Sequence, residues 1–231
     1  MADGSFPATT PVQQIDISDV IATRIRELLA EGKFVPGEQI TESATATAFK
    51  VSRGPVREAL KRLTQEGLLR SERNRGVFVP ILSVADVDDI YLLREGVECA
   101  AIERLIARPD PAVIEKLAAI LDDYERLLAK QDWEAADELD LTFHRELVHS
   151  TGSPRLTHAF DTVMVETRMC LRALVFHHPK HPDMGAWHRD ILGAVERGDA
   201  EAGRRAIRYH NATVLADLSG TDATAEDDQV S

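Results

Sequence analysis

Cysteine, aromatic residues and long apolar runs are all scarce in this sequence of 231 residues. It has two cysteines, Cys99 and Cys170, which excludes a disulfide framework, and we interpret both as small buried residues of apolar helices. The apolar run at residues 171–176 is interrupted by Arg172. No run approaches the roughly 18 apolar residues needed to cross a bilayer, so the sequence predicts no transmembrane segment.

Basic residues are fewer than acidic residues, 27 against 39, which gives a net charge of −12. Attraction of the whole chain to nucleic acid or to an anionic membrane is therefore not expected. Residues 12–80 nevertheless carry 11 basic against 9 acidic residues, while the rest carries 16 against 30, and all eight histidines follow residue 140. This difference predicts two units, residues 12–80 and residues 84–218.

The ends of the chain are poor in structural signals. Residues 1–11 and 220–231 contain few large apolar residues, so we expect them to be disordered tails. The first residues show no basic stretch before an apolar segment, and a secretory signal is not expected. A cytoplasmic protein is the resulting prediction.

Apolar spacing in the first unit predicts three helices followed by a β-hairpin. The first helix is expected to begin at Ser18 and to end at Gly32. The remaining elements are expected at residues 41–49 and 53–67 for the helices, and at residues 68–71 and 76–79 for the strands. Three helices and a hairpin predict a winged helix-turn-helix.

The third of these helices has a basic outer face. Ser52 is expected to cap it, and Arg53, Arg57, Lys61 and Arg62 are expected to point outward. Such a helix can enter the DNA major groove, where a bidentate arginine–guanine contact is worth about 1–3 kcal/mol of discrimination. We expect Arg53 and Arg57 to read bases. A solvated helix with no DNA contact would have the same charge pattern, and this alternative stays open on charge alone.

The tip of the predicted hairpin is basic as well. Arg73 and Arg75 precede Gly76, and they suit the neighbouring minor groove or the phosphate backbone.

Helical periodicity continues through the second unit without a competing strand pattern. Ser83 stands three residues before Asp86, which is typical of a helix N-cap. The six expected helices span residues 84–107, 112–130, 132–150, 154–177, 183–197 and 200–218. The predicted fold class is therefore mainly α, with an N-terminal winged helix-turn-helix followed by an all-α helical bundle.

Four side chains in this bundle have spacings that favour a metal site. Asp140 and His144 are four residues apart on one helix face. His188 and His210 lie about 15 and 18 Å from the turn at Gly198, so antiparallel helices would bring them level. Three imidazoles and a carboxylate suit a divalent cation such as zinc. Each histidine could instead be a hydrogen-bonded or surface residue, which is our interpretation of His149, His158, His177, His178 and His181.

The first unit resembles the DNA-binding domain of GntR-type bacterial transcriptional regulators. The resemblance rests on VSRGPVREALKRL at residues 51–63, EGLL at 66–69 and RGVFV at 75–79, and it extends upstream to Pro36. It implies that four positions lie at the DNA: Ser52, Arg53, Arg57 and Gly76.

The second unit resembles the FCD domain, the all-helical effector module of a GntR subgroup that includes FadR-like regulators. Matching pieces are LRE at residues 93–95 with Glu98, DLTFH at 140–144 and STGSPRL at 150–156. The resemblance implies that a divalent cation is held by Asp140, His144, His188 and His210. It also implies small organic acids as effectors, with Arg94 facing the same cavity.

These observations lead to one hypothesis for function. The chain is expected to be a homodimeric, metal-containing regulator that binds a palindromic operator, with Ser52, Arg53, Arg57, Arg62, Arg75 and Gly76 at the DNA. Zinc is the expected metal, and nickel or manganese would also fit. A purely structural metal and a metal-dependent hydrolase are the alternatives, and the second lacks an identifiable general base.

Overall fold

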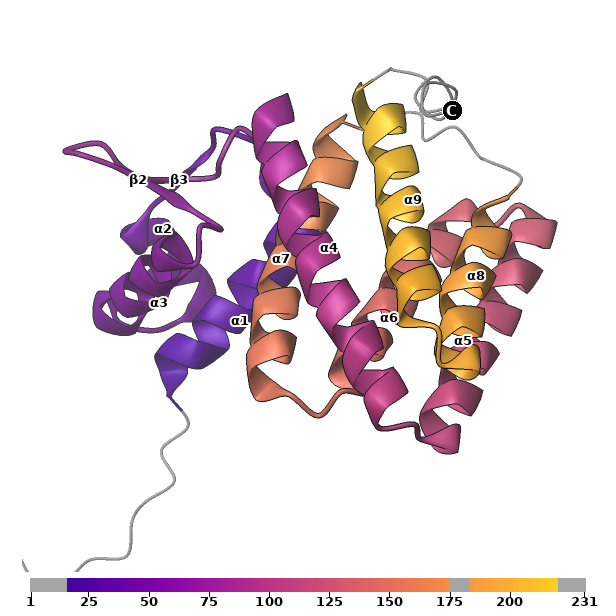
Figure 1. Ribbon diagram of the computed structural model, residues 1–231. Helices are drawn as coiled ribbons and strands as arrows, with labels where there is room; N and C mark the ends of the chain where they lie inside the picture. The colour runs from indigo at the N-terminus through magenta and orange to yellow at the C-terminus, as the bar shows by residue number, and fades with distance from the viewer. Residues whose placement is uncertain (1–15, 175–182, 220–231) are drawn as a thin grey trace, which may run out of the picture.

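The computed structural model describes residues 16–174 and 183–219. Within these ranges the chain forms nine helices and one small sheet of three strands. Figure 1 shows a smaller N-terminal part, the head, beside a larger group of helices, the bundle. The prediction of a mainly α fold with a winged helix-turn-helix and an all-α bundle is confirmed.

The head comprises three helices and three short strands. Its elements are α1 (Ile17–Ala30), β1 (Gln39–Ile40), α2 (Glu42–Phe49), α3 (Arg53–Gln65), β2 (Arg70–Glu72) and β3 (Gly76–Phe78). The antiparallel sheet has the order β1–β3–β2, and Val77 pairs with Ile40 on one side and Ser71 on the other. The predicted hairpin is therefore present, and β1 adds a strand that the sequence did not predict.

The apolar faces of α1 and α3 form the core of the head. Ile21 and Ile25 of α1 and Val56 and Leu63 of α3 are almost completely buried. The predicted strand at residues 68–71 was partly wrong, because Leu68 and Leu69 precede β2 and fill this core instead. Burial of both side chains explains why they resembled a strand.

Two helix starts differ from the prediction. Asp16 caps α1 and accepts hydrogen bonds from the backbone and hydroxyl of Ser18, so Ser18 is not the cap. Ser52 occupies the N-cap position of α3, but its side chain makes no capping hydrogen bond. The predicted N-cap at Ser83 is confirmed, and Asp86 completes a capping box with it.

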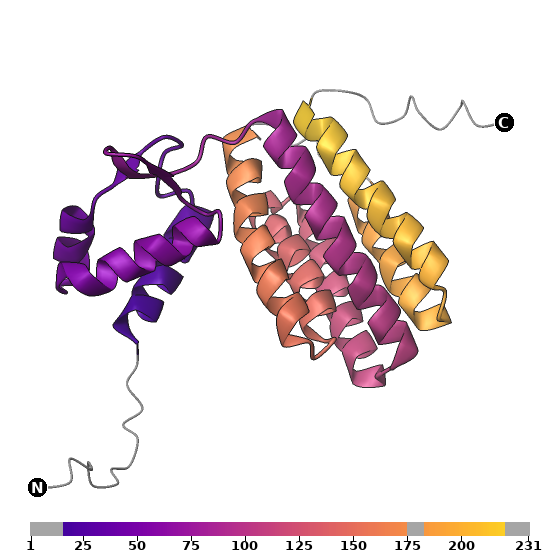
Figure 2. The same ribbon diagram turned by 60° about the vertical axis from the view of Figure 1, so that its left-hand side comes forward.

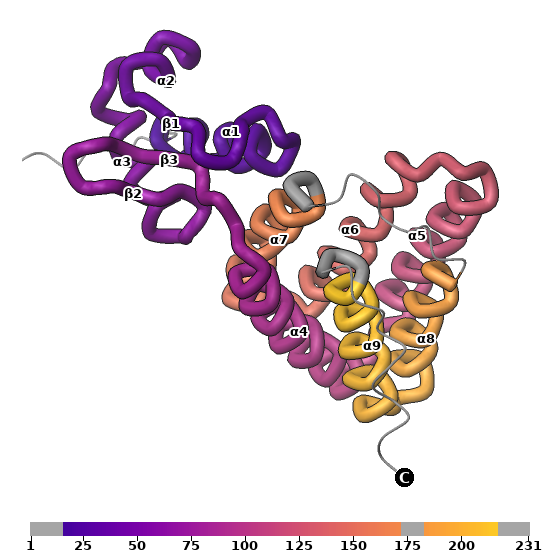
Figure 3. Tube along the Cα trace, turned by 90° about the horizontal axis from the view of Figure 1, so that it is seen from above, coloured from indigo at the N-terminus to yellow at the C-terminus, as the bar shows by residue number. Residues whose placement is uncertain are grey.

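Six helices build the bundle. They are α4 (Val84–Ala107), α5 (Pro111–Lys130), α6 (Trp133–His149), α7 (Pro154–Leu174), α8 (Met184–Arg197) and α9 (Ala200–Ser219). Their bounds agree closely with the prediction, although the expected end of the fourth helix, at residue 177, lies outside the described residues. Seen from above, α4, α7, α6, α5, α8 and α9 surround a common interior (Figure 3).

Helix α7 joins the two parts of the molecule. It lies between the head and α4 in Figures 1 and 2, and it packs against both α1 and α4. Met169 is 9% exposed and belongs to the core of the head, with Val165 packed against the same core. The head therefore rests directly on a bundle helix.

Both cysteines are free thiols; Cys170 is buried, as the sequence predicted, whereas Cys99 is only partly buried. Burial raises the pKa of Cys99 to about 11 and that of Cys170 to about 12. None of the helices in the described part of the chain is long and apolar enough to span a membrane.

Candidate metal centre and DNA-binding face

Four side chains meet inside the bundle at one point. Asp140 and His144 come from α6, His188 from α8 and His210 from α9, and one ligand atom from each lies within 4.8 Å of the others. The His144 Nε2 atom is 3.0 Å from His210 Nε2 and 3.2 Å from His188 Nε2. His188 Nε2 is also 2.9 Å from Asp140 Oδ1. The structure therefore brings together all four predicted ligands.

Local geometry explains this convergence. The four-residue spacing places Asp140 and His144 on one face of α6. Gly198 ends α8 with a φ of 69°, and α9 then runs back along α8. This turn brings His188 level with His210, and their ring centroids lie 4.7 Å apart. The predicted level placement across the α8–α9 hairpin is confirmed.

Acceptor atoms lie against two of the rings. His188 Nδ1 lies 2.8 Å from the carbonyl oxygen of Met184, and His144 Nδ1 lies 2.8 Å from Glu98 Oε1, a close contact without hydrogen-bond geometry. Because a carboxylate oxygen offers no proton, a proton on His144 Nδ1 is favoured, and its Nε2 then presents a lone pair towards His188 and His210. A lone pair that faces other ring nitrogens is stabilised by a proton or a cation between them. The inner atoms of the cluster thus favour a positive ion.

The spacing of these nitrogens also fits a metal. A metal–nitrogen distance of about 2.1 Å places neighbouring ligand nitrogens about 3.0 Å apart in octahedral and about 3.4 Å apart in tetrahedral geometry. The observed separations of 3.0 and 3.2 Å fall in this interval. All three imidazoles are at most 2% exposed. A divalent cation could therefore be held with little rearrangement.

Electrostatics keep the cluster in the form that a metal requires. Burial lowers the pKa of His144 and lowers the pKa of His210 well below its usual range, so both rings favour the neutral form. For Asp140, burial would raise the pKa, but the hydrogen bond with His188 and the nearby imidazoles reverse this and hold it low. Neutral imidazoles and an ionised carboxylate are the species that bind metals.

A buried ion pair lies directly behind the cluster. Arg94 of α4 is 2% exposed and Glu98 is fully buried, and Arg94 Nε is 3.1 Å from Glu98 Oε1. Burial would raise the pKa of Glu98, but the charge of Arg94 outweighs it and lowers this pKa. Arg94 was a predicted site residue and Glu98 was not. The sequence signals for Glu98 were its four-residue spacing from Arg94 and its place among the residues that resemble the FCD domain.

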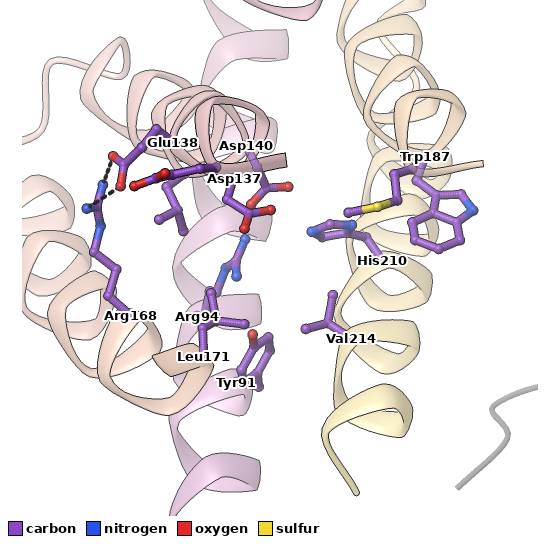
Figure 4. A pocket seen from close by; sticks show the side chains of 13 residues that line it. Tyr91, Arg94, Asp137, Glu138, Asp140, Arg168, Leu171, Trp187, His210 and Val214 are labelled. Atoms are coloured by element: carbon purple, nitrogen blue, oxygen red, sulfur yellow. Dashed lines mark hydrogen bonds and ion pairs between the residues drawn. The ribbon is translucent and has the colours of Figure 1, made fainter. Parts of the chain in front are cut away.

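Beside the four side chains lies a cavity of about 390 Å³. Its apolar wall includes Tyr91 and Trp187. Its polar wall combines two arginines, His210 and four carboxylates: Arg94, Arg168, Glu134, Asp137, Glu138 and Asp140. In Figure 4 the Arg94 side chain extends from α4 towards Asp140, with His210 across the cavity. Arg94 Nη2 has no hydrogen-bond partner within residues 16–174 and 183–219. The cavity thus presents a buried cationic donor next to the cluster.

The N-terminus of α3 displays most of the predicted DNA-binding residues. Ser52, Arg53 and Arg57 are all exposed there. Arg57 donates two hydrogen bonds, of 2.8 and 3.0 Å, to the carboxylate of Glu42 at the start of α2. This pair raises the pKa of Arg57 and lowers that of Glu42. Glu42 was not predicted, because fifteen residues separate it from Arg57.

The wing contributes a second basic position. Arg75 is exposed and pairs with Glu72, and its guanidinium lies 5.5 Å from the centre of the Phe78 ring. Gly76 follows with a φ of 113°, a conformation that side chains rarely allow. Arg62 also pairs with a carboxylate, that of Asp19 in α1, but its side chain is less exposed than those of Arg57 and Arg75.

The other described histidines lie outside the cluster. His149 contacts Asp161 at 2.8 Å and His158 is exposed. His177, His178 and His181 fall outside the described residues.

Comparison with known proteins identifies the family. Residues 17–79 match the model of bacterial regulatory proteins of the gntR family, and residues 89–213 match the FCD domain. A transcriptional regulator of the helix-turn-helix type from Streptomyces ambofaciens is 34% identical over 202 residues, covering 86% of this chain and 83% of the relative. The chain belongs to the GntR family of bacterial regulatory proteins.

Two further proteins resemble this GntR-family regulator. The transcriptional repressor RspR of Escherichia coli K12 is 30% identical over 178 residues, covering 76% of this chain and 77% of the repressor. A GntR transcriptional regulator from Rhodococcus sp. RHA1 has a solved structure with a TM-score of 0.70 and 28% identity, covering 88% of this chain and 97% of that one. This chain is therefore a GntR-family transcriptional regulator with an FCD effector-binding domain, and the names of its relatives favour a non-enzymatic role.

Proposed function

We propose that this GntR-family regulator binds a palindromic operator as a homodimer and senses a small organic acid at a metal ion in its bundle. The observation that carries the proposal is the convergence of three imidazole Nε2 atoms and Asp140 beside a cavity that contains the Arg94 guanidinium. The negative carboxylate of an organic acid complements both the metal ion and the Arg94 guanidinium.

Asp140, His144, His188 and His210 would hold the metal. Nitrogen-rich ligation favours zinc, and nickel or manganese would also fit. When bound, the ion supplies a fixed positive charge that attracts the carboxylate of the acid.

The residues around the cavity would select the acid. Arg94 Nη2 is buried and has no partner among the described residues, so it is free to donate a charge-assisted hydrogen bond to a carboxylate. The apolar wall formed by Tyr91, Leu171 and Val214 would limit the size of the acid.

The head would bind the operator through α3 and the wing. Exposed Ser52, Arg53 and Arg57 can enter the major groove with the positive end of the helix towards the phosphates. Arg75 and Gly76 would follow the neighbouring backbone, whereas Arg62 would have to exchange Asp19 for a phosphate. Two heads related by a twofold axis require a palindromic site, which is why we propose a homodimer.

Helix α7 would couple acid binding in the bundle to DNA binding by the head. Arg168 and Leu171 line the cavity, while Val165 and Met169 pack against the core of the head. An acid that binds one arrangement of α7 better than another shifts the population of head positions, and a coupling of about 1–3 kcal/mol changes DNA affinity about 5- to 150-fold. Residues 12–80 and 84–218 would thus act as two linked units, in the cytoplasm where the operator lies.

A thermal-shift screen of small carboxylic acids tests the proposal. We expect one class of acids to raise the melting temperature of metal-loaded protein, and we expect no effect after chelation or in the His188→Ala variant. The stabilising acid should then change operator affinity in an anisotropy assay. If chelation unfolds the bundle and no acid acts on loaded protein, the metal has a purely structural role and the sensing function is wrong.

A further inference from the structure

One carboxylate oxygen inside the bundle contacts two functional groups at once. Glu98 Oε1 lies 3.1 Å from Arg94 Nε and 2.8 Å from His144 Nδ1. The other oxygen, Oε2, has no hydrogen-bond partner within the part of the chain that the structure describes. Glu98 itself is 0% exposed. Its carboxylate thus joins the arginine of the cavity to a histidine of the metal cluster.

Neutralising Arg94 does not by itself explain this arrangement. An arginine and a carboxylate that meet only each other commonly form two parallel hydrogen bonds. Here Arg94 uses Nε on the shared oxygen, and among the described residues Arg94 Nη2, Glu98 Oε2 and His144 Nδ1 have no partner with hydrogen-bond geometry. A buried group that leaves such atoms without partners loses stability. The shared oxygen nevertheless lies nearer to His144 Nδ1, at 2.8 Å, than to Arg94 Nε, at 3.1 Å, so the carboxylate is placed against His144 as well as against Arg94.

The contact with His144 controls which ring nitrogen faces the metal cluster. A carboxylate at Nδ1 keeps the proton on that atom, so the lone pair of Nε2 points at His188 and His210. Carboxylates behind a metal-bound histidine fix its tautomer and orientation, and losing one typically lowers metal affinity 10- to 100-fold.

We infer that Glu98 is a positioning residue that holds His144 as the Nδ1–H tautomer and links it to Arg94. This inference rests on the proposed metal-binding function. It goes beyond the ligand set, because it makes metal affinity depend on a residue of α4 that does not belong to the cluster.

The first test is the tautomer of His144 in metal-free, full-length protein labelled with ¹⁵N-histidine. Long-range ¹H–¹⁵N spectra distinguish the two tautomers, and the His144→Gln variant identifies the resonance. We expect the Nδ1–H form in the wild type and in Glu98→Gln, whose amide oxygen still places an acceptor against His144 Nδ1. The double variant Arg94→Leu/Glu98→Leu, which removes both buried charges together, should lose this preference.

The second test is zinc affinity, measured by competition with a chromophoric chelator. The double variant should bind zinc 10- to 100-fold more weakly, and Glu98→Gln should show a smaller loss. Glu95→Gln is the matched control, because Glu95 is on the same helix and pairs with Arg208 away from the cluster. Its affinity and its His144 tautomer should match those of the wild type.

An unchanged His144 tautomer together with unchanged zinc affinity in the double variant would overturn the inference. Failure of the proposed function gives a different result. If wild-type protein binds no zinc, the metal proposal is wrong, and the tautomer measurement still decides whether Glu98 positions His144.

Discussion

The arginines proposed to bind DNA and the arginine proposed to bind the organic acid occupy opposite environments. Arg57 and Arg75 of the head have side chains 63% and 70% exposed, and each pairs with a carboxylate at the surface. Arg94 of the bundle is 2% exposed and pairs with the buried Glu98. Surface pairs are weak and exchange readily, whereas a buried pair cannot be broken without stranding a charge.

This difference matches the task proposed for each region. A DNA-binding arginine must leave its carboxylate for a base or a phosphate, so a weak surface partner such as Glu42 suits Arg57. A ligand-binding arginine must stay in one position, and burial beside Glu98 holds Arg94 there. Substitutions in the two regions should therefore affect different measurable properties.

The largest effect should come from breaking the buried pair. Arg94→Leu leaves Glu98 as an uncompensated buried charge, and we expect the free energy of unfolding to fall by about 3–5 kcal/mol in denaturant titrations. Adding Glu98→Leu should recover most of this loss. Arg208→Leu, which removes an exposed arginine, is the matched control and should change stability little. Equal losses for Arg94→Leu and Arg208→Leu would show that burial does not distinguish the two pairs.

Metal removal should have the next largest effect, again confined to the bundle. Zinc at 100 times its dissociation constant should stabilise the bundle by about 2.7 kcal/mol, because it binds the folded form. Calorimetry with and without a chelator measures this difference. His188→Ala should abolish it, and persistence of the full zinc effect in that variant would place the ion elsewhere.

In the head, a substitution should change recognition and leave stability intact. Arg53→Ala removes an exposed side chain at the start of α3, and we expect discrimination between operator and unrelated DNA to fall by about 1–3 kcal/mol. Anisotropy titrations at fixed salt measure it. Lys130→Ala on α5 makes the same change in net charge far from α3 and should keep discrimination. Full discrimination by Arg53→Ala would remove Arg53 from the recognition surface.

The junction between the regions should respond to pH. Glu166 of α7 is partly buried beside Gly67 of the head, where a Cβ atom would lie 3.5 Å from Glu166 Oε1. Burial, with a contribution from Asp89, raises the pKa of Glu166 to about 7.

A folded-state pKa above the ordinary value of 4.5 means that the folded form binds the proton more tightly. Stability from this group is therefore present at low pH and is lost as the pH rises through about 7. Glu166→Gln should be more stable than wild type at pH 8, by about 1–2 kcal/mol after allowance for solvent screening. The gain should be smaller at pH 5, and denaturant titrations at the two pH values measure it. An equal gain in stability at pH 8 and at pH 5 would contradict the raised pKa of Glu166.

Sequence patterns predicted the helices of the bundle well because their signals are local. Gly198 and the Ser83–Asp86 box mark helix ends within a few residues, and both act as expected. The metal cluster was partly predictable for a related reason, since a four-residue spacing indicated the pair Asp140 and His144, and two distances from one turn indicated the pair His188 and His210. The resemblance to the FCD domain implied that the two pairs form one ligand set.

Features created by tertiary packing were not predictable. An arginine and a glutamate four residues apart usually form an exposed helix pair, so nothing local indicated that Arg94 and Glu98 are buried behind His144. The two-residue strand β1 is defined only by its pairing with β3. Leu68 and Leu69 were predicted to lie in a strand because both are apolar. They are apolar because they fill the core of the head, and not because they alternate along a strand.

Metal content after reconstitution decides whether Asp140, His144, His188 and His210 hold a metal ion. Purified protein is loaded with zinc, freed of excess metal and analysed by plasma mass spectrometry, alongside His188→Ala and His158→Ala. His158 is exposed and lies outside the cluster, so its variant is the matched control. We expect about one zinc per chain in the wild type and in His158→Ala, and none in His188→Ala. Equal zinc in both variants, or none in the wild type, would contradict this expectation.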